Sequence, residues 1–338
     1  MPPFLQARDL TVGYRSRGRT RAVLSGINLA AEPGELICLL GVNGIGKSTL
    51  MRTLARAQPA LAGSVAIRGK DIAAMSQYEL ARHVGVVLTE RIAIGAMPAF
   101  RLVELGRYPH VGWLGLLSDA DRKIVDEAIA AVGAGHLAQR DINELSDGER
   151  QRIMIARALA QRPSVLLLDE PAAFLDVSAR VETIATLRRL AREQAIAVIL
   201  SSHDLELSLR TADTIWLIDG DGRLRIGAPE DLVADSSIAD TFSSPNIAFS
   251  PAERSFKIRS RACGKAFISG SAAGIGLART VLEREGFEPA PMPDEARLLV
   301  AIDEEGWNAR TPDARGRGTT FAELARFARA SLQPETRP

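Results

Sequence analysis

The chain has 338 residues, of which 46% are hydrophobic and 25% charged, the balance of a folded globular protein rather than a disordered one. Its formal net charge of +1 gives the whole chain no strong attraction for nucleic acid or for anionic lipid. No basic, apolar leader follows Met1 and the charge-free stretches are too short to cross a bilayer, so we expect neither a secreted nor an integral membrane protein.

The chain begins with short runs of strand-forming residues at 4–12, 22–29 and 35–40. The basic stretch 15–21 between the first two runs is predicted to be a solvated hairpin loop. The third run is almost wholly apolar, which is typical of a strand buried on both faces. A glycine-rich loop and a helix over 47–57 are expected to follow it.

The middle of the chain interrupts the alternation of strands and helices, which resumes after about residue 145. Helical periodicity at 100–107 and 119–132 predicts an inserted helical subdomain at about 90–145. Strands then alternate with helices, which predicts a mostly parallel sheet covered on both faces. The expected helices are 147–161, 177–193 and 205–210, and the expected strands are 165–168, 196–200 and 214–218.

A phosphate-binding loop is predicted after the buried strand, where the sequence matches G-x-x-x-x-G-K-[S/T]. Its glycines allow backbone N–H groups to surround phosphate oxygens, and the following helix adds the positive end of its dipole. Lys47 is expected to reach the β- and γ-phosphates, and Ser48 to give its hydroxyl to Mg²⁺. The loop fits GTPases, kinases and ATPases equally. Its candidate binding residues are Gly41, Asn43, Gly44, Gly46, Lys47, Ser48 and Thr49.

Two acidic residues end the apolar strand at 165–168. Asp169 is expected to hold Mg²⁺ through a water molecule, and Glu170 to polarise the attacking water as a general base. The alternative is a strand followed by a solvated acidic turn.

The segment Leu145-Ser-Asp-Gly-Glu149 opens the helix that precedes this strand. Ser146 with Glu149 three residues later forms a capping box, which is an adequate explanation of the helix start alone. The segment also resembles the signature of the ABC ATPases, L-S-G-G-Q, with Asp147 and Glu149 at its third and fifth places. The resemblance implies that Ser146, Asp147, Gly148 and Glu149 contact ATP held by a second copy of the chain.

Further segments resemble the same family in the family's order, so the resemblance covers residues 4–240. Asp176 matches the D-loop, and His203 matches the switch histidine that contacts the γ-phosphate and serves catalysis. Tyr14 stands where the family places an aromatic ring on adenine. Thr89 or Glu90 stands where the family usually has a glutamine. Glu90 is a candidate to bind Mg²⁺ or to position water, but a carboxylate cannot donate the hydrogen bonds of an amide.

The resemblance implies an α/β P-loop fold of the ABC type over residues 1–240, with a mixed sheet core, an antiparallel β subdomain and the inserted helical subdomain. Repair and chromosome ATPases of the family insert long heptad helices, which this chain lacks, and translation factors usually carry two cassettes. The remaining class within the family is the nucleotide-binding subunit of a transporter. Residues 102–115 resemble the ATPases of iron-chelate, haem and cobalamin importers, and Tyr108 and Trp113 there either dock a permease or pack within the subdomain.

The resemblance therefore predicts the ATP-hydrolysing, energy-coupling subunit of a bacterial ABC importer, with ATP and Mg²⁺ as cofactors. Iron(III)-siderophore complexes are the first choice of substrate, with haem or cobalamin close behind. The expected partners are a second copy, integral membrane permease subunits and, indirectly, a periplasmic or lipoprotein substrate-binding protein. The chain would lie peripherally on the cytoplasmic face of the inner membrane, without nucleic acid. The alternative is a soluble, non-transport ABC ATPase that acts on nucleic acid or in regulation.

The C-terminal part is predicted to be a separate domain, with a polar linker at 241–262 and a small α/β, Rossmann-like extension at 263–338. Strands are expected at 265–268 and 297–302, and helices at 276–285 and 319–331. The turn with Gly270, Gly274 and Gly276 resembles that of short-chain dehydrogenases, but no tyrosine follows Tyr108 and the Tyr/Lys catalytic pair is missing. We expect a structural or regulatory appendage, with a ligand site as the alternative.

Overall fold

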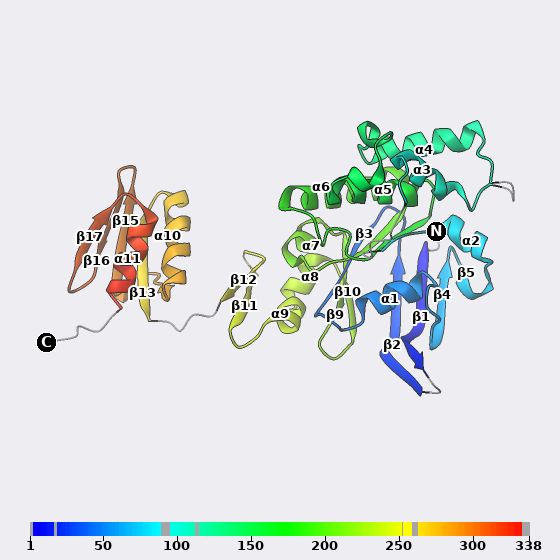
Figure 1. The fold of residues 1–338 in the computed structure, drawn as a ribbon. Helices are drawn as coiled ribbons and strands as arrows, with labels where there is room; N and C mark the ends of the chain where they lie inside the picture. Colours follow the sequence, from blue (N-terminus) through cyan, green and yellow to red (C-terminus); the bar gives the residue numbers. More distant parts are fainter. Residues whose placement is uncertain are drawn as a thin grey trace. The chain divides into compact units, whose positions relative to one another are not determined.

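The computed structural model describes residues 3–16, 19–88, 95–111, 115–251, 253–258 and 263–332. The chain divides into two compact units, Met1–Ser243 with Phe249–Ser255 and Ser244–Ala248 with Phe256–Pro338 (Figure 1). Within the described ranges, none of the helices combines the length and apolarity needed to span a bilayer.

A six-stranded sheet in the order β10-β9-β3-β8-β7-β6 forms the centre of the first unit. Its strands are parallel except the edge strand β10, and all residues of β3, β7 and β8 are buried, as their apolar sequences predict. The strands are β3 (Leu36–Gly41), β6 (Val84–Val87), β7 (Val165–Leu168), β8 (Ala197–Ser201), β9 (Thr214–Ile218) and β10 (Leu224–Gly227).

A second, antiparallel sheet in the order β2-β1-β4-β5 is formed by β1 (Leu5–Ser16), β2 (Arg19–Ala31), β4 (Ala62–Ile67) and β5 (Lys70–Asp71). The predicted hairpin loop at 15–21 is wrong in extent, because both strands continue into it and Arg15 lies opposite Thr20. The exposed, mostly basic side chains of 19–22 gave no apolar alternation from which a strand could be predicted.

The helices of the first unit are α1 (Lys47–Leu54), α2 (Gln77–His83), α3 (Ala99–Glu104), α4 (Asp119–Ala131), α5 (Asp147–Leu159), α6 (Val177–Gln194), α7 (Leu205–Thr211), α8 (Pro229–Ala234) and α9 (Ser237–Phe242). The six helices predicted in this unit begin within one residue of their expected starts, whereas α2, α8 and α9 were not predicted. The helix expected over 47–57 ends earlier, and Arg56 just beyond it has a left-handed φ of 54°. The helix expected over 100–107 ends in the 3-10 turn η2 (Leu105–Arg107).

Arg107 fastens this turn to the helices around it. Its side chain is buried, and it donates to Asp121 on α4 at 3.0 Å and to the carbonyl of Ala160 beyond α5 at 2.7 Å. A Cβ atom at the neighbouring Gly106 would lie 2.1 Å from the carbonyl oxygen of Arg157, so only glycine fits there. The helical subdomain is thereby packed onto α5 (Figure 1).

The segment expected to be a linker, 241–262, contains regular structure. It includes the end of α9 and the two-stranded sheet of β11 (Ile247–Ser250) and β12 (Ser255–Ile258). The prolines and polar residues that suggested a linker lie mainly between these elements.

The second unit is built on a five-stranded sheet in the order β14-β13-β15-β16-β17. β13 (Gly264–Gly270) lies parallel to β14 (Phe287–Pro289) and β15 (Leu298–Asp303), whereas β16 (Gly306–Arg310) and β17 (Arg315–Gly318) are antiparallel. The sequence did not predict β14, β16 or β17, because they are short and rich in charged residues and glycine. The helices are α10 (Ala272–Arg284), four residues longer at its start than predicted, and α11 (Phe321–Ala330).

Candidate functional site

The glycine-rich loop connects the carboxyl end of β3 to the first turn of α1, which is where ligands bind in open α/β sheets. Gly41, Gly44 and Gly46 have φ values of 153°, 78° and 119°, a region that residues with a Cβ atom seldom adopt. A Cβ at Gly46 would also lie 2.6 Å from the Cγ1 atom of Val23. The loop therefore has the curled backbone that a phosphate cradle needs.

Lys47 lies inside this loop with only 5% of its surface exposed. Its ammonium group donates to the carbonyl oxygens of Gly41 at 2.8 Å and Val42 at 3.3 Å. Burial lowers the pKa of Lys47, and the nearby carboxylates of Glu170 and Asp169 oppose that shift. The loop thus carries a cation held at its centre.

Asp169 follows β7 and is brought to the loop by the parallel register of the central sheet. Its carboxylate accepts hydrogen bonds from Ser48 at 3.3 Å and from Ser201 at 2.7 Å. A hydroxyl and a carboxylate side by side are oxygen ligands of the kind Mg²⁺ prefers, directly or through water. The described residues therefore fit the ion that the sequence predicts.

Ser201 was missed as a site residue. Its hydroxyl donates to Asp169 and accepts from the backbone N–H of Glu170 at 2.9 Å, so it holds both acidic residues in place. Leu168 lies opposite Leu200 in the register of β7 and β8, so Ser201 is beside Asp169. A serine ending one buried strand, next to an acid ending its neighbour, was the signal available in the sequence.

Glu170 and His203 lie together, as the motifs predict. The Nε2 atom of His203 is 2.5 Å from a carboxylate oxygen of Glu170. Glu170 also has a left-handed φ of 49°, an uncommon backbone conformation that is frequent at active sites. The two side chains are partly exposed at the end of the sheet where the phosphate loop lies.

Tyr14 contacts α1, the helix that follows the phosphate loop. Its hydroxyl is 2.8 Å from the Thr49 hydroxyl, and nearly half of the tyrosine remains exposed. A ring anchored at one end and open on its surface is suited to stacking.

Ser146 caps α5 and lies on the surface, as the capping box predicts. The side chain of Glu149 accepts from the backbone N–H of Ser146 at 2.9 Å and pairs with Arg140 at 3.0 Å. The Ser146 hydrogen bonds, ahead of the Arg140 charge, lower the pKa of Glu149. Asp147 and Gly148 complete this first turn, in which Asp147 is exposed and Gly148 is partly covered by Leu175 and Ala179.

Asp176 caps α6 by accepting from the backbone N–H of Ala179 at 2.8 Å, and its own side chain is exposed. The next helical turn is fixed by Arg180, which pairs with Asp204 at 3.0 Å, one residue after His203. The D-loop segment and the histidine segment are thus linked directly. Glu90, Thr89 and Trp113 lie outside the described residues.

An open groove of about 530 Å³ lies in the helical subdomain. Leu105, Tyr108 and Leu116 line it and are 44%, 60% and 76% exposed. Arg101, Glu104 and Arg122 also line it, and Arg101 pairs with Glu104 at 2.8 Å.

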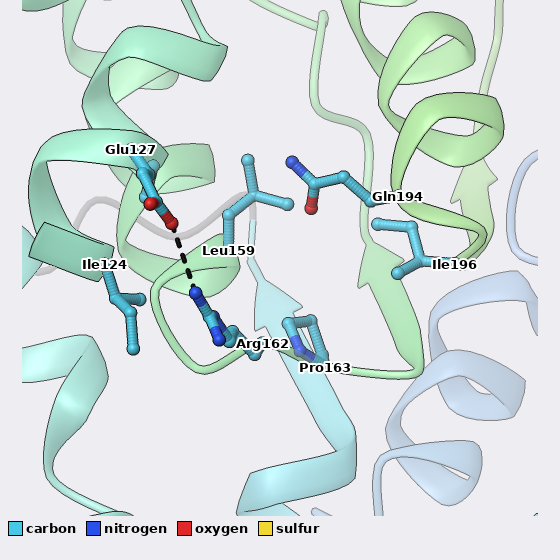
Figure 2. A pocket seen from close by; sticks show the side chains of 8 residues that line it. Ile124, Glu127, Leu159, Arg162, Pro163, Gln194 and Ile196 are labelled. Carbon is cyan, nitrogen blue, oxygen red and sulfur yellow. Dashed lines mark hydrogen bonds and ion pairs between the residues drawn. The ribbon is translucent and has the colours of Figure 1, made fainter. Parts of the chain in front are cut away.

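A second cavity, of about 370 Å³, lies where the ends of α4, α5 and α6 meet (Figure 2). Glu127 and Arg162 face one another in it, with an ion pair of 3.1 Å. None of its lining residues belongs to a motif of the predicted site, so it is separate from the phosphate loop.

The glycine-rich turn of the second unit has a packing explanation. Cβ atoms at Gly270 and Gly274 would lie 2.3 and 2.8 Å from atoms of Ile302 on the adjacent strand β15. Gly276 has open space around it. The hydroxyl of Ser271 accepts from the N–H of Gly274 at 3.2 Å and so caps α10 itself.

Comparisons with known proteins agree with this geometry. The ABC transporter family model matches residues 24–173. An uncharacterised ABC transporter ATP-binding protein of Methanocaldococcus jannaschii is 40% identical over 76% of this chain and 87% of its own length. The achromobactin transport ATP-binding protein of Dickeya dadantii is 34% identical over 70% of this chain and 87% of its own. Other relatives are named for import of hemin and cobalamin.

Among solved structures, the dimeric structure of a bacterial ABC transporter cassette superposes with a TM-score of 0.58 and 26% identity, covering 67% of this chain and 98% of that chain. The expected ABC-type α/β fold is therefore confirmed, and the matched region does not extend over the whole second unit.

Proposed function

The chain belongs to the ABC transporter ATP-binding proteins, which hydrolyse ATP, and from this premise we propose that it energises a bacterial importer of iron(III)-siderophore complexes. The observation that carries the proposal is the groove of the helical subdomain, an exposed apolar surface apart from the ATPase residues. An exposed apolar surface of this kind fits a subunit that docks against a partner protein.

ATP hydrolysis is assigned to the residues that meet at the end of the central sheet. The backbone of Gly41–Thr49 surrounds the phosphates, and Lys47 exchanges its carbonyl partners for phosphate oxygens. Ser48 and Asp169 hold Mg²⁺, which neutralises phosphate charge when bound. Tyr14 stacks on adenine.

Glu170 is the general base in this proposal. Its left-handed backbone and the bond from its N–H to Ser201 aim the carboxylate, and His203 holds one carboxylate oxygen. A carboxylate fixed in this way takes a proton from the attacking water, while His203 contacts the γ-phosphate.

A second copy completes each nucleotide site. The first turn of α5, with Ser146, Asp147, Gly148 and Glu149, presents backbone N–H groups and a hydroxyl on the surface. Such a helix start favours an anion, although the Asp147 and Glu149 carboxylates require the Arg140 contact or the Mg²⁺ charge to balance them. In the proposed dimer, Asp176 at the exposed start of α6 also faces the partner subunit.

The groove is proposed to receive a helix of the permease. Leu105, Tyr108 and Leu116 offer apolar anchors for an amphipathic helix, with Arg101 and Arg122 at the rim. The chain would accordingly lie peripherally on the cytoplasmic face of the membrane, and a periplasmic or lipoprotein binding protein would deliver the substrate to the permease.

The substrate assignment rests on the resemblance of residues 102–115 and on the achromobactin relative, and haem and cobalamin are the alternatives. It is tested by reconstituting the chain in vesicles with the permease that co-purifies with it. ATP-dependent uptake of radioactive iron as a siderophore complex, and not of haem or cobalamin, is the expected result.

The groove is tested in the same vesicles by Tyr108→Arg, which should abolish uptake and co-purification with the permease while ATP binding is kept. Tyr78→Arg is the matched control, since Tyr78 is 68% exposed on α2, outside the groove. Equal uptake by the two variants would refute the docking site, and failure of any permease to co-purify would favour the soluble ATPase.

A further inference from the structure

The sheet of the second unit is covered on one face only. Ala266, Leu298, Val300, Trp307 and Ala309 form a core with apolar residues of both α10 and α11, so the two helices lie on the same face. The residues that alternate with them point to the other face, where they are half-buried or exposed. That face carries an open pocket of about 440 Å³.

The register of the strands places four lining residues in one row across this face. Phe267 lies opposite Leu299, Leu299 opposite Arg310, and Arg310 opposite Arg315. The row is apolar at the β13 end and doubly cationic at the β17 end. Because neighbouring strands lie about 4.8 Å apart, the row spans roughly 14 Å.

A second row runs beside the first and also ends in an arginine on β17. Ser269 lies opposite Ala301, Ala301 opposite Asn308, and Asn308 opposite Arg317. The two rows together place Arg310 and Arg315 at one side of the pocket, next to the side-chain amide of Asn308, and an aromatic and aliphatic floor at the other. Arg317 lies beside Asn308 in the second row, next to this lining.

These arginines have no acidic partner among the residues that the structure describes. Of the acids around the sheet, Glu295, just before β15, pairs with Lys265 at 3.2 Å, and Asp303 accepts from the backbone of Glu305 and Gly306. Asp313 lies in the turn between β16 and β17 and forms no ion pair with these arginines among the described residues. Like charges placed directly opposite on adjacent strands repel, so Arg310 beside Arg315 destabilises the free sheet. A bound anion would remove that repulsion.

We propose that this sheet face binds a small organic anion, with phosphate or carboxylate groups held by Arg310, Arg315 and Arg317 and an apolar ring or chain over Phe267 and Leu299. Guanidinium groups form paired, charge-assisted hydrogen bonds with such groups, which accounts for arginine rather than lysine at all three positions. Asn308 selects polar atoms between the two ends, whereas Ser269 lies at the β13 end and its hydroxyl donates to the carbonyl of Val300 at 3.4 Å. The glycine-rich turn before α10 does not contribute to this proposed anion site, because the Ser271 hydroxyl already accepts from the N–H of Gly274 at the start of the helix.

The test uses naphthyl phosphate as the probe and the isotope-labelled full chain, with binding followed by the shifts of individual backbone amide signals. Amides of β13, β15, β16 and β17 should shift, separately from any shift in Gly41–Thr49. Naphthyl phosphate should bind at least about tenfold more tightly than inorganic phosphate or naphthol, since only the probe engages both ends of the row.

The double variant Arg310→Glu/Arg315→Glu should weaken binding at this face by at least about tenfold. Arg279→Glu/Arg326→Glu makes the same charge change on α10 and α11 and should leave it within about twofold. If the glutamate variant loses its amide pattern, Arg310→Gln/Arg315→Gln replaces it. Shifts confined to Gly41–Thr49, equal losses in both variants, or binding of a single-stranded oligonucleotide but not of naphthyl phosphate would overturn the proposal.

Discussion

The phosphate loop after β3 and the glycine-rich turn after β13 are built alike, yet they differ in what surrounds them. Each follows a strand flanked by two neighbours and opens a helix. At the phosphate loop the neighbouring strand ends bring Asp169 and Ser201 to a buried Lys47. At the second turn, Gly270 and Gly274 allow close approach to β15, and a serine occupies the helix start.

The difference shows that glycines alone do not define a phosphate site. In the first turn, glycine allows the backbone to curl around a ligand. In the second turn, the absence of a side chain at Gly270 and Gly274 allows the turn to pack closely against β15. What distinguishes them is a charged side chain held within the loop and acidic residues beside it.

The largest effect is expected from Glu170→Gln in the first unit. Loss of the general base should lower ATP hydrolysis by at least about 100-fold, while ATP binding is retained because the phosphate loop is unchanged. Phosphate release and nucleotide binding are measured on the same preparation. Steady turnover in the variant would remove Glu170 from the base role.

Gly270→Ala should destabilise the second unit by about 2 kcal/mol or more, because its φ is 138° and the new Cβ would meet the Ile302 carbonyl. Gly276→Ala is the matched control, and it should stabilise α10 by about 0.5–1 kcal/mol. Both are followed by hydrogen exchange of α10 amides in urea. Equal effects would show that the turn is not fixed by packing.

Ser201→Ala should lower ATP hydrolysis by about tenfold, since it removes a donor to Asp169 and leaves the N–H of Glu170 without its acceptor. Ser202→Ala removes a neighbouring hydroxyl whose bond is to the backbone of Asp204, and should stay within about twofold. Comparison of their hydrolysis rates at saturating ATP tests the assignment. A larger loss in Ser202→Ala would contradict it.

The smallest effect concerns Glu285, which joins α10 to α11 by two 2.9 Å hydrogen bonds from Arg329. These bonds lower the pKa of Glu285, so its stabilisation is present above the ordinary carboxyl pKa and is lost as the pH falls through the lower, folded-state value. Glu285→Gln should cost about 0.5–1 kcal/mol at neutral pH.

The difference between the wild-type chain and Glu285→Gln should shrink as the pH is lowered through the acid range. Urea unfolding at neutral and acid pH measures it. A difference that is independent of pH would mean that the carboxylate charge contributes nothing.

The sequence predicted central strands such as 165–168, because an apolar run is a local signal. The motifs are local signals too, and the roles they give to their residues stay predictions. The sequence did not predict Ser201 as a site residue, because that role depends on the register of β7 against β8. It also missed β16 and β17, whose glycines pack against α11 and whose arginines look like loop residues. The sequence alone does not predict roles and strands that depend on contacts between residues far apart in the chain.

Helix α5 connects two parts of the ATPase that have been described separately. It starts at the surface with the Ser146 turn, runs for about 20 Å, and is followed within a few residues by the strand that ends in Asp169 and Glu170. A stiff rod of this kind carries a displacement from one end to the other. In the proposed dimer, where the Ser146 turn meets the partner's nucleotide, α5 would report the presence of that nucleotide to the chain's own Asp169 and Glu170.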